Sequence, residues 1–79
     1  MTGPEKKVQE AVCKYAKGLG YLIKRSYFGP GVEAGWPDTE IYMPYGYTLH
    51  IEFKAPGKPA SKLQKKRIRD LRERGHMAI

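Results

Sequence analysis

The amino-acid sequence predicts one small α/β domain with its elements in the order helix, strand, strand, strand, helix. Three features lead to this prediction: an amphipathic stretch with helical spacing at the start, two aliphatic and aromatic runs joined by a turn, and a capped, basic helix at the end. Because 79 residues leave room for only one compact core, we expect a single domain over residues 1–79.

The first element is expected to be a helix over residues 4–18. Pro4 suits the first turn of a helix, and apolar side chains then recur every three or four residues until Gly18 ends the pattern. This spacing predicts an apolar face that packs on the sheet and consists of Val8, Val12, Tyr15 and Leu19.

Three strands are expected in the middle of the chain. Residues 21–28 have the aromatic and aliphatic composition of a strand, and a glycine-rich loop follows over residues 29–35. A second strand is predicted over residues 39–43 and a third over residues 47–54, with turn residues at 44–46 between them. We expect the second and third strands to form a hairpin.

The last predicted element is a helix that begins after Ser61 and runs to about Arg74. Proline and glycine in residues 55–59 exclude a continuous strand or helix there, Ser61 is a suitable N-cap, and Gly75 is a suitable C-terminal stop. Residues 76–79 resemble the beginning of a further strand, which would be very short or completed by another copy of the chain.

Period-two alternation places the charged side chains of the third strand on one face. The core face is expected to carry Tyr47, Leu49, Ile51 and Phe53, and the opposite face Thr48, His50, Glu52 and Lys54. Asp38 precedes the second strand and therefore lies near the open end of the hairpin, as Glu52 does. Two carboxylates and the ammonium of Lys54 are therefore expected to converge.

Such a pair of carboxylates predicts a divalent cation. Neighbouring carboxylates repel each other unless a cation lies between them, and hard oxygen ligands suit Mg²⁺ or Mn²⁺. A bound ion of this kind activates water and offsets charge on a phosphodiester, while Lys54 is placed to orient the water or stabilise the developing negative charge.

The segments Gly35-Trp36-Pro37-Asp38 and Ile51-Glu52-Phe53-Lys54 resemble the signature of the PD-(D/E)XK nuclease superfamily. More narrowly, the chain resembles short stand-alone, virus-type members of the VRR-NUC family. Three later residues match that family's pattern of a helical glutamine and a leucine-glycine ending: Gln64, Leu71 and Gly75. The resemblance covers residues 5–75.

This resemblance implies a minimal restriction-endonuclease-like fold, with a small mixed sheet flanked by helices, and hydrolysis of DNA phosphodiester bonds. It also implies Mg²⁺ or Mn²⁺ held by Asp38, Glu52 and the backbone carbonyl of Phe53.

The family's acidic residue on the first helix is Glu5 or Glu10 here. At about 100° per residue, Glu5 falls near the apolar face and Glu10 roughly opposite, so we take Glu5 as a metal ligand, the alternative being a helix-terminal charge.

DNA is the expected partner, because 15 Lys and Arg against eight Asp and Glu give a formal charge of +7. Gln64 is open to two interpretations, since it could reach either the site or the nucleic acid. The expected DNA-binding residues are Lys58, Lys62, Gln64, Lys65, Lys66 and Arg69.

A homodimer is also expected, because so small a chain with Cys13 as its single cysteine cannot add an internal disulfide to its core. Two sites related by a dyad would suit a branched substrate such as a four-way junction.

We expect no membrane partner, no small-molecule cofactor and an intracellular location, in a bacterial or phage-infected cell. The alternatives are a non-catalytic DNA-binding module that retains the nuclease fold and an interaction protein whose basic helix meets an acidic partner.

Overall fold

The computed structural model describes residues 4–26, 33–54, 57 and 59–79. No helix within these ranges is long and apolar enough to cross a membrane. The elements are, in chain order, α1 (Pro4–Gly18), β1 (Leu22–Arg25), β2 (Thr39–Tyr42), the short 3₁₀ helix η1 (Pro44–Gly46), β3 (Thr48–Ile51), α2 (Lys62–Glu73) and β4 (Met77–Ala78).

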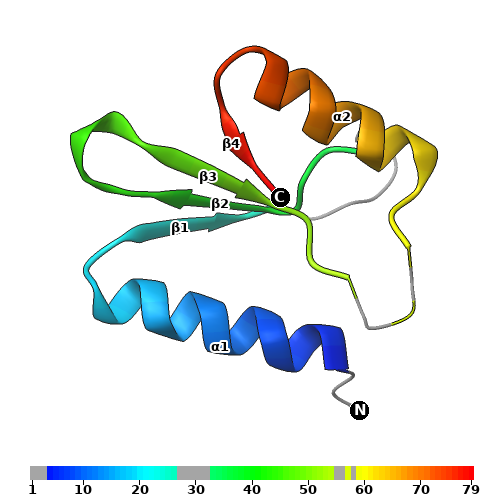
Figure 1. The fold of residues 1–79 in the computed structure, drawn as a ribbon. Helices are drawn as coiled ribbons and strands as arrows, with labels where there is room; N and C mark the ends of the chain where they lie inside the picture. Colours follow the sequence, from blue (N-terminus) through cyan, green and yellow to red (C-terminus); the bar gives the residue numbers. More distant parts are fainter. Residues whose placement is uncertain (1–3, 27–32, 55–56, 58) are drawn as a thin grey trace.

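The four strands form one mixed sheet in the order β1-β2-β3-β4. The first three strands are antiparallel neighbours, and β4 pairs in parallel with β3. Helix α1 lies beside β1, and α2 lies at the opposite end of the sheet, beside β4 (Figure 1). The predicted α/β fold with a mixed sheet flanked by helices is therefore confirmed, and the strand expected at residues 76–79 is β4, paired within the chain.

The core is small and lies between α1 and the centre of the sheet. Its buried members are Ala16, Ile41, Ile51 and Phe53, with Val12, Tyr21, Ile23, Met43 and Leu49 packed around them. The expected packing face of the first helix is wrong in part, because Val8, Tyr15 and Leu19 are between 49% and 71% exposed. The reason is that α1 packs along β1 and leaves the middle of the sheet partly uncovered.

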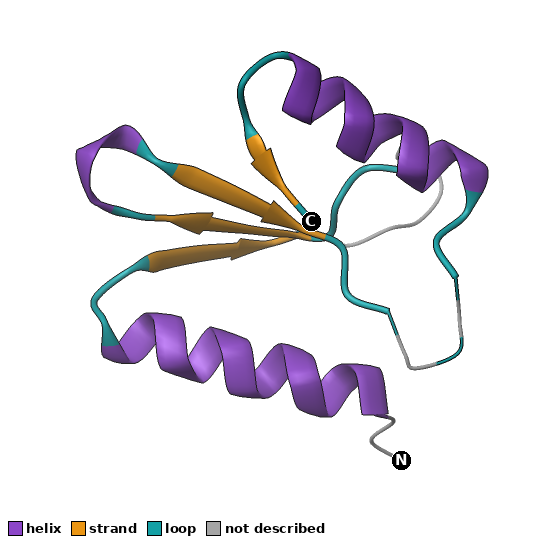
Figure 2. Cartoon of the chain, in the orientation of Figure 1, coloured by secondary structure: helices purple, strands orange, loops and turns teal. Residues whose placement is uncertain are grey.

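The hairpin of β2 and β3 has the predicted turn but a shorter third strand than expected. Figure 2 shows the turn of η1 at the end of the hairpin away from the C-terminus. Strand β3 ends at Ile51 because its partner, β2, begins opposite it at Thr39. Tyr47, predicted for the core, is 59% exposed, since its carbonyl accepts from Met43 N at 2.8 Å and it therefore closes the turn beyond β2.

Helix α2 begins and ends as its capping residues predict. The Ser61 hydroxyl accepts from Gln64 N at 3.1 Å, and the Gln64 side-chain oxygen accepts from Ser61 N at 2.9 Å, which forms a capping box. At the other end Arg74 is the C-cap and Gly75 follows with φ of +87°, a conformation that glycine adopts without strain. The capping box fixes the first turn of α2, including the side chain of Gln64.

Candidate active site

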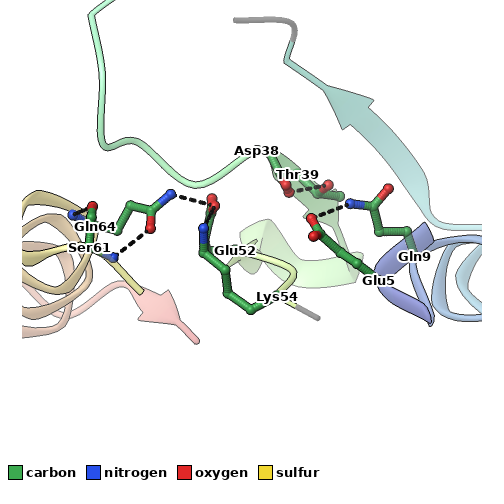
Figure 3. Close-up of polar contacts among 8 residues, drawn as sticks. All are labelled: Glu5, Gln9, Asp38, Thr39, Glu52, Lys54, Ser61 and Gln64. Carbon is green, nitrogen blue, oxygen red and sulfur yellow. Dashed lines mark hydrogen bonds and ion pairs between the residues drawn. The ribbon is translucent and has the colours of Figure 1, made fainter. Parts of the chain in front are cut away.

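Asp38 and Glu52 are brought to the same end of the hairpin by the register of β2 and β3. Thr39 is paired with Ile51, so the residue before β2 and the residue after β3 face each other (Figure 3). Thr39 is fully buried and its hydroxyl donates to Asp38 Oδ1 at 2.9 Å, while the Asp38 carbonyl accepts from the backbone of Ser26 at 2.8 Å. The chain is therefore held on both sides of the Asp38 carboxylate.

Glu52 lies in a nearly closed environment. Its side chain is 10% exposed, and its Oε1 accepts from Gln64 Nε2 at 2.8 Å and lies 3.5 Å from Lys54 Nζ. Its Oε2 is buried and has no hydrogen-bond partner within the described ranges. Burial raises the pKa of Glu52 above its usual range, and the neighbouring charge of Asp38 raises it further, while Lys54 acts in the opposite direction.

This environment fits a divalent cation. A buried carboxylate oxygen without a partner is energetically costly, and a second carboxylate nearby adds repulsion. A cation that contacts both groups removes both costs, and carboxylate oxygens are the ligands that Mg²⁺ and Mn²⁺ prefer. Asp38 and Glu52 are therefore the residues that would hold the ion.

Gln64 reaches the site, which was one of the two interpretations that the sequence left open. Its side-chain oxygen is used by the capping box, so its amide nitrogen is turned toward Glu52 and donates to it (Figure 3). The same side chain therefore starts α2 and orients the Glu52 carboxylate. Its predicted contact with DNA stays a prediction.

Glu5 approaches from the other side of the site. Its carboxylate accepts from Gln9 Nε2 at 3.3 Å and points from α1 toward the end of β2 where Asp38 lies, while Glu10 is exposed (Figure 3). Within the described part of the chain, no three Asp, Glu, His or Cys side chains are close enough to hold a metal ion together. The metal-ligand roles of Glu5 and of the Phe53 carbonyl therefore stay predictions.

Sequence reasoning missed two side chains that orient the carboxylates. Gln9 bonds Glu5 and accepts from Arg25 at 2.7 Å, and Thr39 bonds Asp38. Both had a detectable signal: Gln9 stands four residues after Glu5, the spacing at which helical side chains meet, and Thr39 places a hydroxyl directly after the acid.

A groove of about 410 Å³ adjoins Glu52 on the α2 side. Lys65 and Arg69 line it together with Glu52, Lys54 and Gln64. Of the other predicted DNA contacts, Lys62 and Lys66 are exposed on α2 outside this groove, Lys66 pairs with Asp70 at 2.9 Å, and Lys58 lies outside the described residues. The cations near the site therefore belong mainly to one side of α2.

A solved structure described as a VRR_NUC domain is among those similar to this chain. The match covers 96% of this chain and 81% of that one, with a TM-score of 0.82 and 22% sequence identity. No protein-family model matches the sequence, and no curated protein matches it. The chain therefore has the fold of a VRR_NUC domain, which confirms the resemblance at the level of the fold. A fold alone does not determine the chemistry of a site.

Proposed function

We propose that this chain is a nuclease that hydrolyses DNA phosphodiester bonds with Mg²⁺ or Mn²⁺ held by Asp38 and Glu52. The observation that carries the proposal is the Glu52 carboxylate, which is buried beside Asp38. One of its oxygens is held by Gln64 and Lys54, and the other has no partner among the residues that the structure describes. This arrangement is costly without a cation and favourable with one. The similarity in fold to a VRR_NUC domain adds support.

The residues around the ion have separate tasks in the proposed reaction. A bound ion would lower the pKa of a water molecule and offset negative charge on the phosphate. Lys54 keeps 34% of its side chain exposed while its ammonium is 3.5 Å from Glu52, so it can contact the water or the phosphate. Gln64 holds the Glu52 carboxylate in one orientation, which limits the reorganisation needed when the ion binds.

DNA is the proposed substrate because the groove beside the carboxylates carries Lys65 and Arg69, and the whole chain has a charge of +7. Lysine and arginine contacts to phosphate provide affinity without sequence preference. The proposed enzyme would therefore select its substrate by shape, and a four-way junction is the first structure to test.

We also propose that two copies of the chain assemble through the groove between α1 and the sheet. This groove has a volume of about 500 Å³ and is lined by apolar side chains apart from Glu52 and Lys54. Two copies with a charge of +7 each repel one another least when they meet through an uncharged face, whereas an acidic partner would be drawn to the basic surface. A second copy is therefore the occupant that this groove favours, and Val8, Tyr15 and Leu19 would become buried.

The test of the nuclease proposal is cleavage of a panel of duplex, flap, nicked and four-way-junction DNA in Mn²⁺, with EDTA as the control. Calorimetry measures Mn²⁺ affinity in parallel. Lys54→Ala should abolish cleavage and largely keep metal affinity, because the ammonium does not bind the cation, whereas Asp38→Ala should lose both. If the wild type binds Mn²⁺ and DNA but cuts no substrate, the non-catalytic DNA-binding alternative is correct.

The test of the dimer is the mass in solution by light scattering at micromolar concentration. We expect twice the 9.0 kDa of one chain. Tyr15→Glu places a charge at an exposed position of the apolar groove and should produce the single-chain mass without loss of the fold. A wild-type mass of one chain together with full nuclease activity would contradict the dimer.

A further inference from the structure

Arg67 of α2 contacts both a carboxylate and an aromatic ring of the turn that precedes β2. Its Nη2 lies 2.5 Å from Glu33 Oε1, and its Cζ lies 4.4 Å from the centre of the Trp36 ring. Its side chain is 19% exposed. A guanidinium stacked on an aromatic ring and paired with a carboxylate is held in one geometry, so it is poorly available to a phosphate.

The turn that Arg67 contacts is pressed directly against α2. Gly35 has a φ of +91°, and a Cβ at this position would lie 2.4 Å from the Leu63 side chain. Leu63 and Arg67 are four residues apart and therefore share one face of the helix. Glu33, Gly35 and Trp36 thus contact the same face of α2.

This turn leads directly into the site. Pro37 follows Trp36 and is buried, and the next residue is Asp38. A displacement of the turn would therefore move the backbone that carries the Asp38 carboxylate. Proline limits how much of that displacement the backbone can absorb, because its φ is fixed.

Helix α2 contacts the Glu52 carboxylate directly and also contacts the turn that leads to Asp38. Gln64 donates to Glu52, and Arg67, one turn later, contacts Glu33 and Trp36. We propose that Arg67 is a positioning residue, which clamps the turn of residues 33–36 on α2 and so keeps Asp38 in place, and that it is not a phosphate contact. The inference rests on the proposed function in taking Asp38 as a metal ligand.

Replacing Arg67 with Lys separates the two roles, because Lys keeps the positive charge but cannot reproduce the planar stacking on Trp36. Trp36 is the one tryptophan of the chain, so its fluorescence reports on the clamp in the intact protein. The measurements are acrylamide quenching of Trp36 in EDTA, DNA affinity in EDTA, and Mn²⁺ affinity by calorimetry. Arg67→Ala and Glu33→Gln serve as further variants, and Arg74→Lys, at the C-cap of α2 and away from the turn, is the matched control.

For Arg67→Lys we expect stronger quenching of Trp36 and Mn²⁺ affinity lower by about tenfold or more, the usual effect of losing a residue that orients a metal ligand. DNA affinity in EDTA should stay at the wild-type value. Arg67→Ala should weaken Mn²⁺ binding at least as much, Glu33→Gln in the same direction but less, and Arg74→Lys should change neither quenching nor Mn²⁺ affinity.

The proposal is overturned if Arg67→Lys retains wild-type Mn²⁺ affinity and wild-type quenching. It is also overturned if Arg67→Ala lowers DNA affinity as much as Lys65→Ala does, because a phosphate contact would do so. If the wild type binds no Mn²⁺, the proposed function is wrong, but this result does not decide the role of Arg67. Quenching of Trp36 then shows whether Arg67 holds the turn against α2. Thermal unfolding of each variant shows whether the fold is retained, and Glu33→Gln decides the result if Arg67→Ala does not fold.

Discussion

Replacing Gln64 with Ala should destabilise the protein and weaken metal binding. The two effects have separate causes, and the size of each can be estimated from the hydrogen bonds that are lost. The variant loses the hydrogen bond from Ser61 N, which contributes about 0.5–1 kcal/mol as a partly exposed neutral pair. It also loses the 2.8 Å bond to the buried Glu52 carboxylate, a bond to a charged group that contributes about 1.5–3 kcal/mol. The expected loss of unfolding free energy at neutral pH is therefore about 2–4 kcal/mol.

The effect on metal binding follows from the orientation of Glu52. Without this donor the carboxylate keeps only its contact with Lys54 and is held less firmly, so Mn²⁺ affinity should fall by about 10–100-fold. The assays are urea unfolding without metal and calorimetric titration with Mn²⁺.

Ser61→Ala is the matched control for this prediction. It removes the acceptor for Gln64 N and should cost about 1 kcal/mol as an N-cap loss, but it leaves the bond from Gln64 to Glu52 in place. Its Mn²⁺ affinity should therefore equal that of the wild type. Equal Mn²⁺ affinity for Gln64→Ala and wild type would refute the reasoning, and an equal loss in Ser61→Ala would assign the effect to the start of α2 instead of to Glu52.

Three further predictions concern pH, salt and packing. Because burial raises the pKa of Glu52 above its ordinary 4.5, the free energy of unfolding of the metal-free protein should fall as pH rises from 4.5 through the raised pKa. Urea unfolding at constant ionic strength measures this pH dependence, which Glu52→Gln should reduce; an unchanged pH dependence would contradict the assignment. Replacing Lys65 and Lys66 with Ala should reduce the slope of log DNA affinity against log salt by up to about 2 in EDTA, and an unaltered slope would exclude α2 as the DNA surface. Gly35→Ala should destabilise the fold by at least about 1 kcal/mol, because the new Cβ would overlap the Leu63 side chain and the backbone φ is +91°. Thermal unfolding measures the effect, and a wild-type melting temperature would disprove the close packing of the turn.

The elements of the fold were predictable because their signals are local. Pro4 and Gly18 mark the bounds of α1, and Ser61 and Gly75 mark those of α2, through capping and backbone preferences that act over a few residues. The turn at residues 44–46 likewise indicated the hairpin. Element bounds that depend on a distant partner were less accurate, as the end of β3 shows, because a strand continues only as far as its neighbour pairs with it.

The candidate site was predictable in part for the same reason. Asp38 and Glu52 flank one hairpin, so a short-range register is enough to bring them together. Gln64 was recognised as a candidate, but the sequence did not show that its side chain points to Glu52, because this depends on how α2 lies against the end of β3. Arg67 had no predicted role, since its pairing with Glu33 joins positions 34 residues apart.

The sequence by itself determined the order of helices and strands, the capping of α2 and the hairpin that joins the two carboxylates, because each follows from residues close together in the chain. Only the tertiary structure decided that β4 pairs in parallel with β3, that Val8, Tyr15 and Leu19 stay largely exposed, and that α2 contacts Glu52 and the turn before Asp38. The physical reason is that burial and hydrogen bonding between distant segments depend on the relative placement of whole elements, which local propensity does not encode.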